Sequence, residues 1–311
     1  MNISPRQLRM FLALSESLNF SKAAEQLFMT QPSLSKAIRD LEDALGLALF
    51  ERTTRSVLLT PSGARLARMA RSVIGEFDAG VKRMRTSAEQ EARQLYIASL
   101  PSLANVILPS VCSALEQRFS QPGITIHDCT NNASIQRLLN YEVDFALASV
   151  APSHPDLQYE EILRDRFVVL SCGAWRRRVA DVVRLDELQA LPVISMTDAS
   201  TAMRYISAAF LQRGVEFRPK MQLDQVGSIA GFIKEGFGVA VLPYLGMMPM
   251  VSLKGMKISS IADGPLRSVG VVMRRQGAPS AIAQAAMQEV RRVAQALMDR
   301  HPHWLLPSAP R

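Results

Sequence analysis

The sequence predicts two folds in one chain: an N-terminal all-α winged helix-turn-helix with a long linker helix, and a C-terminal two-lobed α/β domain. Three observations predict this. Short helical patterns and two short strands fill the first sixty residues, and a long amphipathic helical pattern follows them. Beyond residue 93, strands and helices alternate. The chain has 311 residues, too many for one ordinary domain.

Three helices are predicted before residue 46. The first runs over 4–17, and the second over 22–27 with Ser21 as its N-cap. Thr30 is predicted to cap the third helix, and Gly46 to end it. Because a tight turn of about three residues joins the second and third helices, the pattern favours a helix-turn-helix.

The third helix carries the residues that we expect to contact DNA. A recognition helix enters the major groove with its amino end first, and amide, hydroxyl and ammonium groups bond to base edges and phosphates. The alternative is an ordinary three-helix packing unit with a polar outer face. The residues of this predicted DNA face are Gln31, Pro32, Ser33, Ser35, Lys36 and Arg39.

A strand, a basic turn and a second strand are predicted over 47–59, which is the pattern of a wing. Arg52 and Arg55 at its tip are placed to reach phosphate or a narrow minor groove, and we include Thr53 between them. From Arg52 to Arg71 the chain is rich in arginine and has no acid, and the whole chain carries a net charge of +8. A basic balance is compatible with a polyanionic partner.

A long helix is predicted from Pro61 to about Thr86. Apolar residues recur along it at coiled-coil-like steps of three or four. This pattern favours a dimer seam, and the alternative is packing against the rest of its own chain. The seam residues are Leu66, Val73, Phe77 and Val81.

The remaining residues predict an α/β fold with mainly parallel strands. The predicted strands are 94–99, 124–128, 144–150, 167–171, 193–196, 220–223, 239–242 and 268–273. The predicted helices are 104–119, 135–141, 185–191, 202–213, 228–235 and 280–298, and the last residues from 302 are predicted to form a loose tail. Two chain crossings, near 163–164 and 264–265, would divide this part into lobes and leave a cleft between them.

Four strand-to-helix turns are predicted to line that cleft. They comprise residues 99–102, 129–132, 198–201 and 226–228. Their hydroxyls, amides and free backbone N–H groups suit a polar or anionic metabolite. Asp128 and Asp198 would repel an anion, so they either face away or select a cationic or neutral ligand. Each Ser, Thr or Asn here has the alternative role of a simple helix cap.

Several stretches of the sequence resemble LysR-type transcriptional regulators. In the first ninety residues they are 8–14 (LRMFLAL), 19–27 (NFSKAAEQL), 30–38 (TQPSLSKAI) and 59–63 (LTPSG). Weaker matches follow at 107–109 (ILP), 143–147 (VDFAL) and 236–243 (GFGVAVLP). The wing departs from the family, because Thr53, Thr54 and Arg55 stand where small or basic residues are usual.

The resemblance implies a winged helix-turn-helix over 1–60, a linker helix over 61–88, and a periplasmic-binding-protein-like (type 2) effector domain. Its lobes would be 91–163 with 266–302, and 164–265. The implied partners are a pseudo-palindromic operator in double-stranded DNA, a small-molecule effector, and further copies of the chain in a homodimer or homotetramer; RNA polymerase is an open possibility. Six of the effector contacts come from matching positions of this sequence to the family, and we add Ser102 and Ser200 from the same turns. The full set is Ser99, Pro101, Ser102, Thr130, Asn131, Ser200, Thr201 and Gly227.

The sequence contains little that would serve catalysis. We find no nucleophile elbow, Walker loop, dinucleotide-binding glycine motif or metal-ligand pattern, so we predict no catalytic residue, cofactor or metal. No apolar run is long enough to span a bilayer, and the expected location is cytoplasmic. The leading function is a ligand-responsive transcriptional regulator. The alternatives are a DNA-bound regulator without an effector, and an enzyme with an accessory DNA-binding part.

Overall fold

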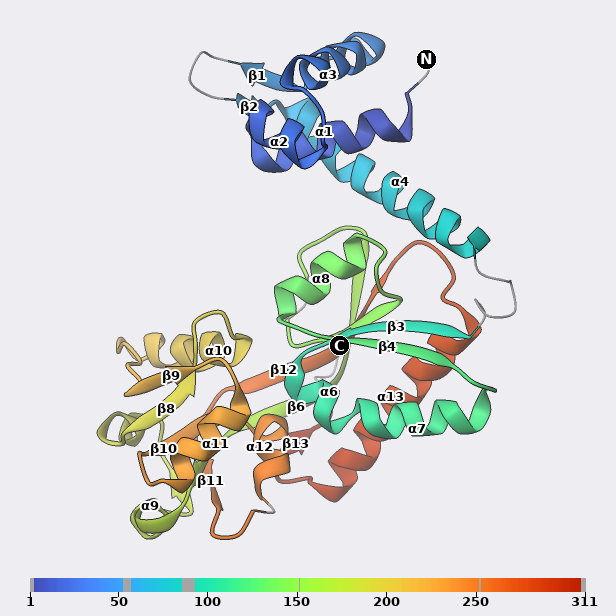
Figure 1. Ribbon diagram of the computed structural model, residues 1–311. Coiled ribbons are helices and arrows are strands. Elements are labelled where there is room, and N and C mark those ends of the chain that lie inside the picture. Colours follow the sequence, from blue (N-terminus) through green and yellow to red (C-terminus); the bar gives the residue numbers. More distant parts are fainter. Residues whose placement is uncertain (1–2, 53–56, 86–92, 151, 252, 309–311) are drawn as a thin grey trace. The chain divides into compact units, whose positions relative to one another are not determined.

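The structure is a computed structural model that describes residues 3–52, 57–85, 93–150, 152–251 and 253–308 (Figure 1). It forms two compact units. Unit one is Met1–Ala88 with Leu139–Glu142, and unit two is Glu89–Leu138 with Val143–Arg311. We describe each unit by itself.

Unit one begins with three helices: α1 Pro5–Ser17, α2 Phe20–Gln26 and α3 Gln31–Leu45. A capping box starts α1, because the side chains of Ser4 and Gln7 each bond the other's backbone N–H. The prediction that Ser21 caps α2 is wrong. Asn19 is the cap, since its Oδ1 accepts the backbone N–H of Lys22 at 3.0 Å.

The core of unit one forms where these helices meet the wing. Leu34, Ile38 and Leu41 of α3 are fully buried, and the rings of Phe11 and Phe50 lie 5.5 Å apart. The wing strands β1 Phe50–Arg52 and β2 Val57–Leu59 pair antiparallel. The long helix α4 Pro61–Arg85 follows. Burial of one face of each short helix therefore holds the unit together.

Unit two is built on one mixed sheet. The described strands are β3 Gln94–Ser99, β4 Gly123–Asp128, β5 Phe145–Ala148, β6 Leu157–Ser171, β7 Val182–Val183, β8 Val193–Met196, β9 Met221–Leu223, β10 Val239–Pro243, β11 Lys257–Ile261, β12 Leu266–Arg274 and β13 Leu305–Leu306. Their order is β4-β3-β5-β12-β6-β10-β8-β9, with β11, β7 and β13 off this path. Three parallel strands at each end of the path form two half-sheets, and antiparallel β12 and β6 join them.

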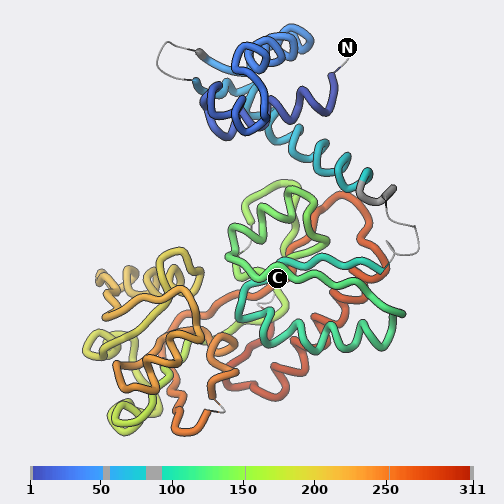
Figure 2. Tube along the Cα trace, in the orientation of Figure 1, coloured from blue at the N-terminus to red at the C-terminus, as the bar shows by residue number. Residues whose placement is uncertain are grey.

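Helices pack around these strands. They are α6 Pro101–Val106, α7 Leu108–Arg118, α8 Asn131–Leu139, α9 Gly173–Arg178, the 3₁₀ helix η1 Asp186–Ala190, α10 Thr201–Leu211, α11 Val226–Lys234, α12 Tyr244–Val251 and α13 Ala281–Arg300. The single helix predicted over 104–119 is two, since α7 begins with Leu108 and Pro109. The half with β3, β4, β5, α6, α7, α8 and α13 is lobe 1, and the half with β8, β9, β10, α10, α11 and α12 is lobe 2 (Figure 2).

Two long strands connect the lobes. Strand β6 starts ten residues earlier than predicted and runs through both half-sheets, pairing with β12 and then with β10. The prediction of a loose tail from residue 302 is wrong for the first half of that segment. Strand β13 pairs with Asp165 and Arg164 of β6, and Trp304 stacks on Tyr244 with ring centroids 5.5 Å apart. Residues 304–306 are therefore fastened to β6 and to the start of α12.

Candidate nucleic-acid interface and effector site

The predicted DNA face lies on the outer side of α3. The side-chain oxygen of Thr30 accepts the backbone N–H of Ser33, which caps the helix. All members of this face are exposed except Ser35, which is half-buried. The three fully buried leucine and isoleucine side chains of α3 point the opposite way, into the core. A rigid helix therefore presents amide, hydroxyl and cationic groups at its amino end, where the helix dipole also attracts phosphate.

The wing is tied to α3 by a contact that the sequence analysis missed. The Glu42 carboxylate accepts the backbone N–H groups of Leu49 at 2.9 Å and Phe50 at 3.2 Å. Thr53 and Arg55 of the prediction lie outside the described residues, and Arg52 is described only as the last residue of β1. The placement of the wing's contact residues stays a prediction.

Helix α4 has two apolar faces. Ala67 and Ala70 are buried in the core of unit one, and Ile74 on the same face is also buried. A second stripe is exposed and recurs every four residues; its members are Met69, Val73, Phe77 and Val81. Leu66 of the predicted seam instead packs against the core of unit one. Met69 was missed, because spacing alone does not show which of two adjacent apolar faces the small domain covers.

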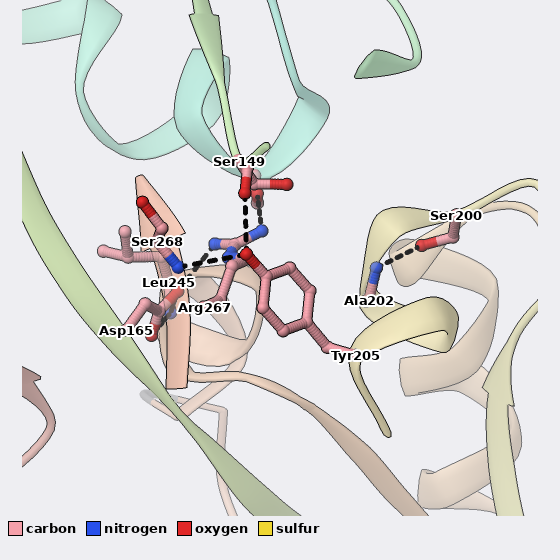
Figure 3. Close-up of polar contacts among 9 residues, drawn as sticks. Ser149, Asp165, Ser200, Ala202, Tyr205, Leu245, Arg267 and Ser268 are labelled. Atoms are coloured by element: carbon pink, nitrogen blue, oxygen red, sulfur yellow. Dashed lines mark hydrogen bonds and ion pairs between the residues drawn. The ribbon is translucent and has the colours of Figure 1, made fainter. Parts of the chain in front are cut away.

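A polar cluster connects the two lobes of unit two, and we call it the interlobe junction: Ser102, Asn131, Ser149, Asp165, Tyr205 and Arg267. Figure 3 shows Ser149, Asp165, Tyr205 and Arg267 of this cluster. Its first part centres on Ser149, directly after β5. The Tyr205 hydroxyl on α10 donates to the Ser149 carbonyl at 2.8 Å, and the Ser149 N–H donates to Asn131 Oδ1 at 3.1 Å. Burial raises the pKa of Tyr205, so its hydroxyl keeps its proton at neutral pH. These bonds connect α10 of lobe 2 to α8 of lobe 1.

The second part of the interlobe junction is a buried ion pair. Arg267 on β12 donates from Nη2 to Asp165 of β6 at 2.6 Å, and from Nη1 to the Ser102 hydroxyl at 3.0 Å. The N–H of Leu245, at the start of α12, donates to both oxygens of Asp165 at 3.3 Å. Burial raises the pKa of Asp165, whereas Arg267 and this N–H oppose the rise.

Two buried polar atoms of the interlobe junction have no hydrogen-bond partner among the described residues. They are the Ser149 hydroxyl and Nε of Arg267. A buried donor without a partner costs free energy, and most such groups in proteins are satisfied. The junction therefore still offers hydrogen-bonding capacity after its internal bonds are counted.

The structure brings two of the predicted effector residues into this junction, Ser102 and Asn131. Ser99 is fully buried, and its hydroxyl donates to the Leu100 carbonyl. Thr130 and Ser200 act as helix caps, accepting the N–H groups of residues 133 and 202 at 3.4 and 3.1 Å. For these two hydroxyls the alternative role of a cap is realised.

The other three predicted residues differ in exposure. Thr201 is buried at the start of α10, whereas Pro101 and Gly227 are exposed. Asp198, which we expected to repel an anion, accepts a hydrogen bond from the side chain of Gln222 at 3.1 Å. Partial burial raises the pKa of Asp128.

The remaining members of the junction were missed by the sequence analysis. Asp165 is flanked by Arg164 and Arg166, which is typical of a solvated charged segment, so its sequence gave no signal of burial. Arg267 is a lone charge between Leu266 and Ser268, and its neighbours indicate burial only weakly. Ser149 and Tyr205 carry no local signal, because their roles depend on contacts between segments more than fifty residues apart.

The described residues include three cysteines and no cluster of side chains suited to a metal ion. No group of three His, Cys, Asp or Glu side chains there could hold a metal ion. The three cysteines, Cys112, Cys129 and Cys172, are unpaired thiols, and burial raises the pKa of Cys112. No helix among the described residues has the length and apolar character to cross a membrane.

Two protein-family models match this chain. Residues 5–64 match the model described as bacterial regulatory helix-turn-helix protein, lysR family. Residues 88–295 match the LysR substrate binding domain. Together the two matches span both units.

Curated proteins and solved structures resemble the chain over nearly its whole length. The HTH-type transcriptional regulator YfeR of Shigella flexneri is 24% identical over 298 residues, 96% of each protein. The DNA-binding transcriptional dual regulator OxyR of Escherichia coli is 26% identical over 309 residues, 97% of each. Full-length CbnR in complex with its target DNA has a TM-score of 0.55 at 19% identity, covering 94% of this chain and 99% of CbnR. The similarity to these chains over both units confirms the predicted fold class.

Proposed function

The chain belongs to the LysR family of bacterial DNA-binding transcriptional regulators, and we propose that α3 reads its operator while a small molecule binds at the interlobe junction. The family is one of regulators with an effector-binding domain and not of enzymes. A regulator of chromosomal genes works where the chromosome lies, so we place it in the cytoplasm.

The exposed outer face of α3 carries the DNA proposal. Its polar and cationic side chains stand opposite a fully buried apolar face, so the helix can enter a groove without exposing its core. The CbnR complex is a structure of similar fold bound to its target DNA. We propose base-edge and phosphate contacts by the predicted DNA face, with Arg52, Thr53 and Arg55 on the flanking DNA.

Two variants test this docking on a duplex that wild-type protein selects from a random-sequence pool. Lys36→Ala should weaken binding to that duplex by about 1–3 kcal/mol. Arg52→Ala should weaken binding to all DNA sequences by a similar factor. It should also reduce the slope of log affinity against log salt concentration by about one, because one phosphate contact is lost. Arg176→Ala removes an equal charge from exposed α9 of unit two and serves as the control. Wild-type affinity and salt slope in both test variants would contradict the docking.

The unsatisfied Ser149 hydroxyl and Arg267 Nε support the effector proposal. A ligand that accepts hydrogen bonds would satisfy both atoms, and Arg267 and the hydroxyls around it favour a polar or anionic group. The relatives carry names as different as RuBisCO operon transcriptional regulator and hydrogen peroxide-inducible genes activator. We therefore propose the chemical class only. A thermal-shift screen of organic acids, amines and neutral metabolites tests it, since a bound ligand stabilises the folded state.

The exposed stripe of α4 supports self-association. We propose that Met69, Val73, Phe77 and Val81 pair across a two-fold axis and present two recognition helices to a pseudo-palindrome. Further pairing into a tetramer and contact with RNA polymerase are extensions of the same proposal.

A further inference from the structure

The turn between α2 and α3 exposes one large aromatic side chain. Phe28 is 99% exposed. Its neighbours Leu27 and Met29 are partly buried against the core of unit one. The backbone N–H of Phe28 donates to the backbone carbonyl of Glu25 at 3.1 Å, and that of Met29 donates to the backbone carbonyl of Ala24 at 3.0 Å. The turn is thus held on both sides, and the ring alone points outward.

Two local preferences are violated at this position. Phe28 has φ of 51°, in the left-handed region that suits Gly and Asn and disfavours a bulky side chain. Its ring also gains nothing from burial within the unit. Residues that break local rules without compensation in their own domain are expected at functional positions.

The position of Phe28 indicates what covers it. It lies three residues before Gln31, in the turn that leads into α3, and like Gln31, Pro32 and Ser33 it is exposed. The exposed apolar stripe of the proposed dimer is on a different element, α4. Because a recognition helix enters the major groove amino end first, the residue just before that end meets the edge of the groove. The thymine methyl group and the deoxyribose are the apolar surfaces that duplex DNA offers there.

We propose that Phe28 is a DNA-contacting residue whose ring packs on a thymine methyl or a deoxyribose at the edge of the major groove. The proposal rests on the docking of α3 described above. It assigns to the turn an apolar contact that complements the polar and cationic contacts of the helix. An apolar contact neutralises no phosphate, so it contributes affinity without changing the salt dependence.

Phe28→Asn separates a DNA contact from a purely local role. Asn tolerates the left-handed backbone, so the variant should keep or raise the melting temperature of the protein. It should nevertheless bind the selected duplex at least about fivefold more weakly, with the salt slope of wild type. Phe28→Tyr keeps the ring and should bind within about twofold of wild type.

Leu18→Asn is the matched control. Leu18 is also an apolar residue with a left-handed backbone in unit one, with φ of 46°, but it ends α1 and is only 38% exposed. This variant should keep or raise the melting temperature and leave DNA affinity unchanged. Thymines of the duplex are also replaced by deoxyuridine one at a time. If deoxyuridine at one position weakens binding by wild type but not by Phe28→Asn, the ring contacts the thymine methyl at that position. If no position behaves in this way and Phe28→Asn still binds more weakly than wild type, the ring contacts the deoxyribose.

Wild-type DNA affinity in Phe28→Asn would overturn the proposal. So would a lower sedimentation mass of that variant without DNA, because another copy of the chain would then cover the ring. If Lys36→Ala weakens binding while Phe28→Asn does not, only the role of Phe28 fails. If neither variant weakens binding, the docking of α3 itself fails.

Discussion

Asp165 and Arg267 are the most deeply buried charged pair among the described residues, with 0% and 3% of their surfaces exposed. Each compensates the other's desolvation, and Ser102 and the start of α12 satisfy further bonding capacity. The pair lies on β6 and β12, the two strands that join the lobes. A single charged pair therefore links the connecting strands to α6 of lobe 1 and α12 of lobe 2.

Removing one partner of this pair should destabilise unit two strongly. Arg267→Met leaves an uncompensated buried carboxylate, and we expect its free energy of unfolding to fall by about 3–5 kcal/mol. The double variant Asp165→Leu with Arg267→Met removes both charges and should recover most of that loss. Denaturant unfolding of the three proteins measures the difference. A double variant as unstable as the single one would show that packing, not charge, dominates here.

At the scale of elements, α4 combines two tasks on one helix. Its buried face completes the core of unit one, and its exposed face is available to a second copy. Arg9 of α1 lies over the Phe77 ring at 5.9 Å and forms an ion pair with Asp78, so the exposed face is held in place from its own unit. A preorganised helix lowers the entropic cost of association.

Phe77→Asp should break the proposed dimer. The change would replace an apolar seam side chain with a carboxylate that faces its own copy across the two-fold axis. The nearby Arg9 is already paired with Asp78, so it offers limited compensation. We expect the sedimentation mass to fall. Arg68→Asp, on a neighbouring exposed face of α4, adds the same carboxylate and should leave the mass unchanged. An unchanged mass for Phe77→Asp would place the association surface elsewhere.

At the scale of the whole molecule, a regulator of this kind must couple two sites that lie in different units. A ligand shifts the protein between states only to the extent that it binds them with different affinity. Coupling of about 1–3 kcal/mol is ordinary, and DNA must change the ligand's affinity by the same factor. The bond between Tyr205 and Ser149 joins the lobes, and we propose that a ligand at the junction acts by making or breaking it.

Ser149→Ala tests this coupling with the compound that stabilises wild type most in the thermal-shift screen. The variant loses a buried hydroxyl but keeps the carbonyl that accepts from Tyr205. We expect about tenfold more compound to be needed for any change in DNA binding, and unchanged DNA affinity without it. Ser171→Ala removes another buried, unpartnered hydroxyl, at the end of β6, and is the control. Equal responses from both variants would remove the junction from the effector site.

The sequence by itself determined what depends on near neighbours in the chain. Caps at Ser4 and Thr30, the end of α3 at Gly46, and the apolar period of that helix are local, so they predicted the helix-turn-helix and its outward face. Alternating strands and helices predicted the α/β class in the same way. The two chain crossings and the strand-to-helix turns predicted the lobes and the candidate turns, and the family resemblance agreed with the lobes and selected individual turn residues by position.

Only the tertiary structure decided which of those candidates share a site. Ser102 and Asn131 join the interlobe junction, whereas Thr130 and Ser200 cap their own helices. Tyr205 enters because α10 packs beside β12, and strand β13 forms because β6 offers it an edge. The physical reason is the same in each case. These contacts join segments far apart in the chain, and their free energy exists only once both segments are folded.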